Sequence, residues 1–488
     1  MAAYTFTSDD GKTYKRNLHG FEALCNSWAL HDFLFAFTGS AEVQLNDVSG
    51  APLSKDVVVS ILRTAWIVLR HRVPAVALGM TYHPEDASWT VAYDVPSGLD
   101  EVNSWVDQTL VWRETKPDCL AHEFDEKWEC THGEFPLRLM VSPVGASRPS
   151  WIDGRPNIHN AASVDLKAIK WGEEVARLAA TGAVLTGLDI NKMDNSETDK
   201  KPEAFVPFMP PLMENKVRTH DIAMRLVVFD NARTSALRQK CRENNTTMTM
   251  AVDAIFACAQ AEAVLSSAAA IGGSHYTSTV EAYNNALHCQ KLTIILKRPS
   301  WPTSNSINRP EGTTLFGTDG FTLQANMDVF RKAVGFSANK NSFDRCDNDF
   351  FWSTVIGEIV TAHGGPDKSL AGYVERERQK TEQCKTFHPS SMLVKMPITS
   401  SIGDLDRLGL FAKYLPGSSS PTKVHRVLFR ARTLVPTMNN LYYQYDGKLN
   451  CSLLASAQWY SPSEMDEMEV ILRRWFDRVV GEVDCEVV

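Results

Sequence analysis

Helical and strand-like segments follow one another irregularly along this chain, and that mixed order most constrains the folds it can adopt. Apolar residues keep helical spacing in Ser54–Arg72, whereas Ala223–Phe229 has the pattern of a strand. Two further strands, Leu441–Tyr445 and Leu449–Ser456, flank Asp446-Gly447, a dipeptide that favours a hairpin turn. Because these elements form no regular β-α-β series, the sequence predicts an α+β fold with mixed layers.

Further helices are predicted from apolar spacing and from capping residues at their starts. Ser54 suits an N-cap of the first helix, and Pro74 stops it. The other predicted helices are Leu166–Ala180, a helix capped by Asp230 or Asn231 that runs through Asn244, the segment Ala251–Ala270, and Ser461–Val480. Ala251–Ala270 is apolar but carries Asp253, Gln260 and Glu262, so we expect a buried helix with a polar edge.

The chain has 488 residues, which is too long for one simple core. A polar, charged stretch at Asn191–Glu203 precedes the proline-rich Pro207–Pro211 and marks an exposed crossover. We therefore expect an N-terminal lobe over residues 1–195, a linker over 196–215 and a C-terminal lobe over 216–488.

Charge, hydropathy and cysteine spacing exclude several classes of function. The net charge of −8 comes without a Lys/Arg-rich block, so nucleic acid is not an expected partner. No apolar run reaches about 18 residues, so no membrane span is expected. The ten cysteines form no CxxC pair and no zinc spacing, so no metal is expected. With no signal peptide visible, reduced thiols in the cytoplasm are the expected state.

One short segment, Pro156–Lys167 (PNIHNAASVDLK), carries a histidine and an aspartate ahead of a predicted helix. Side chains alternate in an extended chain, so 159, 161, 163 and 165 share one face. A predicted strand, Phe135–Leu139, lies shortly before this segment in the sequence.

Five segments, in this order along the chain, resemble the chloramphenicol-acetyltransferase-like superfamily. They are Ala65–Pro74, the strand Phe135–Leu139, the strand–helix–Thr–helix run Met224–Leu265, Ser400–Asp404 (SSIGD), and the hairpin Tyr445–Leu449 with the final helix. The superfamily includes plant BAHD acyltransferases, peptide-synthetase condensation domains and fungal enzymes of the trichothecene 15-O-acetyltransferase type. The resemblance implies two similar lobes with a tunnel between them, where an acyl-CoA meets an acceptor alcohol or amine.

In these families a His-x-x-x-Asp motif lies in the tunnel, and its histidine takes the acceptor's proton. Asp165 matches the aspartate, which in the family holds the loop, usually by pairing with a buried arginine. The histidine position is Ala161, and Asn160 stands where condensation domains often have a second histidine. Arg298, after the apolar strand Leu292–Leu296, matches the pairing arginine, although a surface arginine is the alternative.

His159 is the nearest replacement for the missing base. It faces the same way as Ala161 in an extended segment but lies about 6–7 Å further along the strand. Proton transfer needs a contact of about 3 Å or one bridging water, so His159 requires a bulge to reach the same atom.

Three interpretations of Ala161 remain open. In the first, His159 replaces the base and the protein is an acyltransferase. In the second, the base is lost and the pocket shapes a substrate for cyclisation, isomerisation or a pericyclic step. In the third, Ala161 marks an engineered variant of an acyltransferase or a non-catalytic binding protein. The leading prediction is an O-acyltransferase of fungal-type secondary metabolism. We expect it to act as a monomer, with acyl-CoA as cosubstrate and a hydrophobic small molecule as acceptor.

The remaining candidate residues come from the second half of the chain. Ser400 and Ser401 match a family element that faces the tunnel and helps an oxyanion, while a turn or helix-capping serine pair is the alternative. Trp352 is placed beside the substrate, together with Asn160 and Ala161, although Phe351-Trp352 also fits a core aromatic pair that opens a helix.

Overall fold

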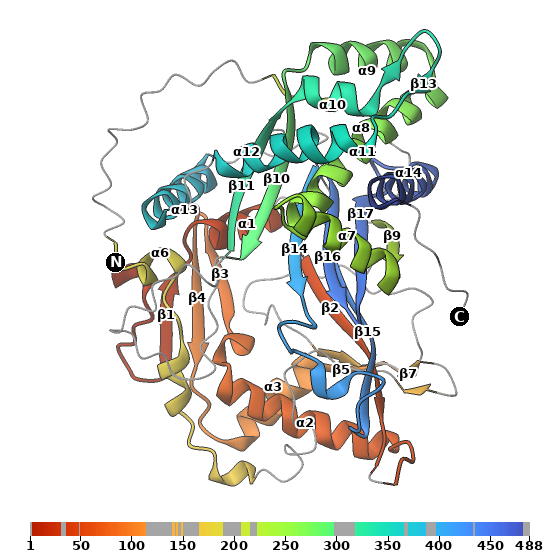
Figure 1. Ribbon diagram of the computed structural model, residues 1–488. Coiled ribbons are helices and arrows are strands. Elements are labelled where there is room, and N and C mark those ends of the chain that lie inside the picture. The colour runs from red at the N-terminus through yellow and green to blue at the C-terminus, as the bar shows by residue number, and fades with distance from the viewer. Residues whose placement is uncertain are drawn as a thin grey trace.

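A six-stranded sheet forms the centre of the larger lobe (Figure 1). The computed structural model describes residues 2–30, 36–47, 49–113, 139–141, 143–144, 148–149, 165–188, 206–214, 222–296, 318–365, 369–386, 397–432 and 435–481. The strand order is β11 (Thr318–Asn326), β10 (His288–Leu296), β14 (Pro397–Asp404), β16 (Met438–Tyr445), β17 (Lys448–Ser456) and β9 (Ile222–Phe229). Only the pairings of β14 with β10 and β16 are parallel; the other neighbours in this sheet are antiparallel.

Helices cover one face of this sheet and bury a large apolar core against it. They are α7 (Asn231–Glu243), α8 (Met248–Ile271), α9 (Gly273–Asn285), α10 (Met327–Val334), α11 (Asn348–Phe350), a π-helical turn (Phe351–Val355), α12 (Ile356–Gly364) and α14 (Pro462–Val480). Side chains of α8, α12 and α14 join those of β9, β16 and β17 in one cluster. We call the sheet with these helices the second lobe.

The first lobe has a smaller, three-stranded antiparallel sheet in the order β1 (Thr13–Asn17), β4 (Ser88–Asp94) and β3 (Gly79–His83). It also contains α1 (Phe21–Leu30), α2 (Lys55–Arg72), α3 (Leu99–Thr109) and the short strands β5 (Leu110–Trp112) and β6 (Leu139–Val141). Trp66 of α2 stacks on Trp105 of α3 with ring centroids 5.5 Å apart. The two helices therefore share one aromatic core.

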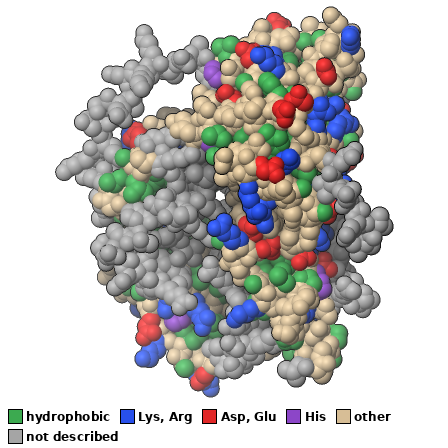
Figure 2. Space-filling model, in the orientation of Figure 1, with side chains coloured by type: hydrophobic (Ala, Val, Ile, Leu, Met, Phe, Trp, Pro, Cys, Tyr) green, Lys and Arg blue, Asp and Glu red, His purple; other side chains and the backbone are tan. Residues whose placement is uncertain are grey.

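Two elements from the second half of the chain pack against the first half. The long strand β2 (Ala36–Leu45) pairs antiparallel with β15 (Thr422–Arg432) along its whole length, and α13 (Leu370–Lys385) lies beside α1 (Figure 1). On the face shown in Figure 2, acidic and basic side chains of the second lobe are interspersed. The predicted boundaries 1–195, 196–215 and 216–488 follow chain order alone and remain a prediction.

Most of the predicted elements are confirmed, with ends shifted by a few residues. The confirmed elements are α2 with Ser54 at its N-cap, β9, α7 capped by Asp230, α8 capped by Thr247, β10, the hairpin β16–β17, and α14 with a capping box between Ser461 and Glu464. Asp446 and Gly447 have φ angles of 51° and 73°, as a type I′ hairpin turn requires. The fold class, a mixed α and β architecture, is therefore confirmed.

The predicted helix Leu166–Ala180 is wrong. The structure has two separate 3₁₀ turns, Leu166–Ala168 and Glu173–Arg177, followed by the short helix α6 (Gly182–Leu185). Gly172, with φ of 103°, turns the chain into the left-handed region between them. Glu174 is fully buried there and accepts hydrogen bonds from the Tyr93 hydroxyl at 2.9 Å and the Gly172 amide at 2.6 Å. These tertiary contacts outweigh the helical spacing.

Helix α8 is buried, as predicted, and its polar residues are buried with it. Asp253 and Glu262 are buried, and Gln260 is only 9% exposed. Glu262 accepts hydrogen bonds from Arg345, from Arg474 at 3.2 Å and from the Trp475 indole at 2.9 Å, and so joins α8 to α14. By length and composition α8 is also the one described helix that would pass as a membrane span, but 61% of its most apolar window is buried inside the protein.

The contact between α1 and α13 gives a first testable prediction. Gly20 has φ of 62°, and a Cβ there would overlap Glu377, whose carboxylate is held by the Phe21 amide at 3.1 Å and Lys380 at 2.9 Å. We expect Gly20→Ala to destabilise the protein by about 2–3 kcal/mol, measured by urea unfolding. Gly11→Ala is the matched control, because its φ is 70° with open space around it and only backbone strain of about 1 kcal/mol applies. Equal losses in the two variants would contradict the close approach of α13.

Candidate active site

The predicted motif lies mostly outside the described residues. His159, Asn160, Ala161 and Arg298 are among those left undescribed, so their roles remain predictions. Asp165 is described: it is exposed and caps the 3₁₀ turn Leu166–Ala168, where its carboxylate accepts from the Lys167 amide at 3.0 Å. This hydrogen bond fixes the chain just after the motif. The pairing of Asp165 with Arg298 remains a prediction.

Ser400 and Ser401 lie inside strand β14, which excludes the turn or helix-cap alternative. Adjacent residues of a strand face opposite sides of a sheet. Ser400 is opposite Leu441, on the face where Leu441 packs with Ala431 of β15, and it is buried. Ser401 is opposite Tyr442, on the face covered by α8, and it is partly exposed. The two serines therefore do not point into the same space.

A β-bulge follows Ser401 directly. The pairing register between β14 and β16 shifts between Ser401 and Gly403, and Gly403 has φ of 105°. Bulges often lie beside active sites, where they change the direction of a side chain or end the pairing of a strand. Asp404, which closes the strand, is held at 2.9 Å by Arg238 of α7. The end of β14 is thus fixed to a helix of the second lobe.

Ser401 lies beside a polar cluster in the core of the second lobe. We call Ser401, Tyr442, Asp253 and His363 the β14 hydroxyl chain. Ser401 is opposite Tyr442 on β16, and the Tyr442 hydroxyl lies 3.3 Å from Asp253 Oδ1 and 3.4 Å from the Thr249 carbonyl. The other carboxylate oxygen of Asp253 is 2.9 Å from His363 Nε2. Strands β14 and β16 and helices α8 and α12 therefore meet in one polar network.

Burial affects the protonation of Tyr442. It raises the pKa of the Tyr442 hydroxyl well above its ordinary value, and the Asp253 carboxylate raises it further. The side chains of Thr249 and Ser401 oppose that rise. Tyr442 consequently keeps its proton at neutral pH and remains a hydrogen-bond donor.

Trp352, in contrast, belongs to the apolar core. Its indole donates to the Val479 carbonyl at 3.0 Å, and its ring meets Phe351 edge to face with centroids 5.5 Å apart. The side chain is only 7% exposed. Both residues lie in the π-helical turn after α11, so they open a helix as the sequence indicated. A substrate contact at Trp352 remains a prediction, and its packing is that of a core residue.

Sequence reasoning missed the β14 hydroxyl chain beyond Ser401. Asp253 was visible as a polar residue in an apolar helix, and a buried carboxylate requires hydrogen-bonding partners. The sequence did not identify Tyr442 and His363 as those partners, because they lie 189 and 110 residues further along the chain. Among the described residues, no group of three or more His, Cys, Asp or Glu side chains is placed to hold a metal.

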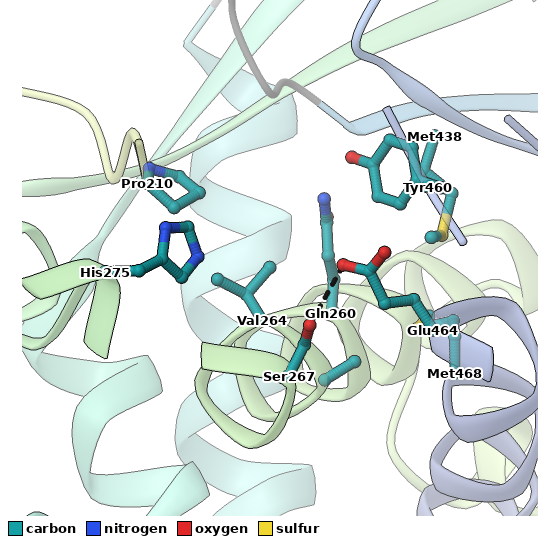
Figure 3. Close-up of a pocket in the computed structure, with 10 residues that line it drawn as sticks. Pro210, Gln260, Val264, Ser267, His275, Met438, Tyr460, Glu464 and Met468 are labelled. Carbon is teal, nitrogen blue, oxygen red and sulfur yellow. Dashed lines mark hydrogen bonds between the residues drawn. The ribbon is translucent and has the colours of Figure 1, made fainter. Parts of the chain in front are cut away.

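A separate crevice lies between α8, α9 and α14 (Figure 3). Figure 3 shows the ends of Gln260 and Tyr460 directed toward one space, with Pro210 and His275 on its other side. The space for a water-sized group is about 20 Å³, enough for roughly one water. Its lining includes none of the residues of β14 or of the β14 hydroxyl chain. We therefore base the candidate site on β14 and not on this crevice.

Comparisons with known proteins agree on the fold. No protein-family model and no curated protein matches the sequence. Among solved structures, the trichothecene 15-O-acetyltransferase TRI3 from Fusarium sporotrichioides matches with a TM-score of 0.74 at 11% identity, over 97% of each chain. The epimerization domain from the third module of tyrocidine synthetase B matches with a TM-score of 0.51 at 11% identity, over 95% of this chain and 98% of that one.

A third solved structure, the nonribosomal peptide synthetase FmoA3, is a longer chain. It matches with a TM-score of 0.52 at 12% identity, over 96% of this chain and 43% of its own. The protein therefore has the two-lobed fold of the chloramphenicol-acetyltransferase-like superfamily, and the resemblance seen in the sequence is confirmed at the level of fold.

The buried hydrogen bond between Asp253 and His363 gives a second prediction. Asp253→Asn replaces the carboxylate that lies 2.9 Å from His363 Nε2 with little change in shape, and disturbing a buried hydrogen bond in this way costs about 1–3 kcal/mol. We expect a clear loss of stability in urea unfolding. Glu375→Gln is the control, because its pair with Arg378 is partly exposed and contributes less than about 1 kcal/mol. If the two variants lose the same stability, the Asp253–His363 pair is not the buried anchor described above.

Proposed function

We propose that this protein transfers an acyl group from an acyl-CoA to a hydroxyl of a hydrophobic small molecule. The observation that carries the proposal is the structural match over 97% of both chains to an enzyme described as an O-acetyltransferase. The similarity extends over nearly the whole length of both chains. Fold alone does not define a reaction, and the residues must supply the rest of the argument.

The chemistry requires a proton acceptor and a place for the thioester. The acceptor's oxygen attacks the thioester carbonyl, a C–O bond forms, the C–S bond breaks, and the hydroxyl proton finally passes to the CoA sulfur. We propose His159 as the group that takes this proton, since Ala161 has no base to offer. Asp165 fixes the chain after the motif through its bond to the Lys167 amide. Asn160, Ala161 and β14 are proposed to border the acceptor.

A second candidate function follows from one observation, the alanine at position 161. A scaffold without a base can still hold a flexible substrate in a reactive conformation, and proximity alone accelerates an intramolecular reaction. The protein would then be a cyclase, a pericyclase or an isomerase that converts one substrate without CoA. A binding protein that retains a ligand unchanged is the remaining alternative.

The proposed function is tested first by substitution of the proton acceptor. We expect the wild-type protein to release free CoA from acetyl-CoA in the presence of hydrophobic alcohols, measured by thiol detection and mass spectrometry of the ester. His159→Ala should lower kcat by about 10²–10⁴-fold, the usual contribution of a general base. His83→Ala is the matched control, because His83 bonds Thr90 within the β3–β4 hairpin of the first lobe and should leave kcat unchanged.

The results separate the candidate functions. Conversion of a single substrate without acetyl-CoA supports the cyclase or isomerase and overturns the transferase. Ester formation that persists in His159→Ala keeps the transferase but removes His159 from its mechanism.

Restoring the family motif provides an independent prediction. Ala161→His re-creates His-x-x-x-Asp with Asp165 in this chain. If the scaffold still binds an acyl-CoA and an alcohol, a base at position 161 should raise kcat by at least about tenfold, as general-base catalysis allows. Ala161→Gln controls for side-chain size without a comparable base. A rate that rises equally in both variants, or in neither, would contradict a transferase pocket around position 161.

A further inference from the structure

Strand β9 forms one edge of the six-stranded sheet, and among the described strands none pairs with its outer side (Figure 1). Its sequence, IAMRLVVF, is rich in residues that favour strands and contains one charged side chain, Arg225. Val228 on this strand is 36% exposed. An unprotected edge of this composition would offer backbone N–H and C=O groups to another extended chain, including a second copy of the same strand.

Thr234 shows which backbone groups of β9 point outward. Its hydroxyl accepts from the Leu449 amide at 2.9 Å and donates to the Phe229 carbonyl at 3.2 Å, so it bridges β17 and β9. The Phe229 carbonyl is therefore directed toward β17. Because successive residues of an antiparallel strand alternate between the two sides, the carbonyls of Met224 and Val228 lie on the outer side.

Two arginines occupy these two outward carbonyls. Arg225 donates to the Met224 carbonyl at 2.7 Å, and Arg473 of α14 donates to the Val228 carbonyl at 3.2 Å. Both acceptors would otherwise be available to a neighbouring strand. Charged donors are among the devices by which natural sheets protect an open edge.

Carboxylates of α14 hold both guanidinium groups in place. Arg225 donates to Asp466 at 2.6 Å, and Arg473 donates to Glu469 at 2.8 Å. The guanidinium of Arg473 also lies over the Phe229 ring, 5.8 Å from its centroid. The two arginines are thus fixed to one helix and, through it, to the edge of the sheet.

The two capped positions are symmetric about Leu226. If two β9 strands paired antiparallel around Leu226, Met224 of one copy would lie opposite Val228 of the other and exchange backbone hydrogen bonds with it. Such a pairing is self-complementary, as a twofold dimer requires. It would need the same two carbonyls that the arginines occupy.

We propose that Arg225 and Arg473 close the edge of β9 against β9 of a second copy of this chain, and that pairing about Leu226 is the association they prevent. The inference concerns the chain in solution and does not depend on the proposed reaction. It supplies a physical basis for the monomer expected from the sequence.

The first experiment removes both caps while keeping side-chain length. Arg225→Met with Arg473→Met should raise the association constant for dimers about tenfold or more, because each change frees a carbonyl that a charged donor had occupied. Sedimentation velocity over a concentration series measures this change against wild type. The matched control is Arg242→Met with Arg407→Met, two exposed arginines outside β9 and α14, which removes the same charge and adds the same apolar surface.

The second experiment tests the pairing register. In the variant without caps, Leu226→Cys should cross-link two copies under mild oxidation, because paired Cα atoms would be about 5.5 Å apart, within disulfide reach. Val228→Cys in the same background is the control, since its own counterpart would be displaced by about 13 Å along the strands. Both variants keep the same native cysteines, and a non-reducing gel compares the yields of dimer.

The expected result is dimer formation that follows loss of the caps and cross-linking that prefers position 226. The proposal is wrong if the variant without caps associates no more than its control, or if both cysteines cross-link equally. It is also wrong if Leu226→Cys alone already cross-links with both arginines present. Should the double variant not fold, Arg473→Met alone must associate more strongly than Arg242→Met alone, and equal association refutes the proposal.

Discussion

The burial of α8 against the six-stranded sheet is the constraint on which the second lobe depends. An apolar helix in the core gains free energy from its own burial, but every carboxylate it carries must be hydrogen-bonded or paired. Glu262 meets this requirement with donors from α14 and from Arg345, and Asp253 meets it with His363 of α12 and Tyr442 of β16. The helix is thus fixed on two sides by hydrogen bonds to its carboxylates, and one of these sets of bonds reaches Tyr442 of β16.

The sequence predicted local structure well wherever a few neighbouring residues decide it. The hairpin turn at Asp446-Gly447 and the start of the final helix at Ser461 depend on side chains within three residues, so the prediction succeeded. The segment after Asp165 failed, because burial of Glu174 beside Tyr93 outweighed a helical pattern. The sequence did not reveal the pairing of β2 with β15 or the partners of Asp253. These contacts join residues far apart in the chain, and no local pattern marks them.

The fold and the chemistry of this protein place different demands on the sequence. A fold survives at 11% identity because apolar patterning and approximate volume suffice to keep layers packed. A reaction depends on single atoms, so one changed residue in a catalytic motif can alter the chemistry while the fold is kept. This is why the five segments indicated the fold correctly while leaving three interpretations of the motif open. Side chains also alternate along β14, so the adjacent Ser400 and Ser401 face opposite sides of the sheet.

The two candidate features of the site belong to different lobes and can therefore change independently. The motif residues precede Asp165 in the first lobe, whereas the β14 hydroxyl chain is built entirely from elements of the second. A substitution before Asp165 therefore leaves the buried Asp253 and its contacts with Tyr442 and His363 unaltered.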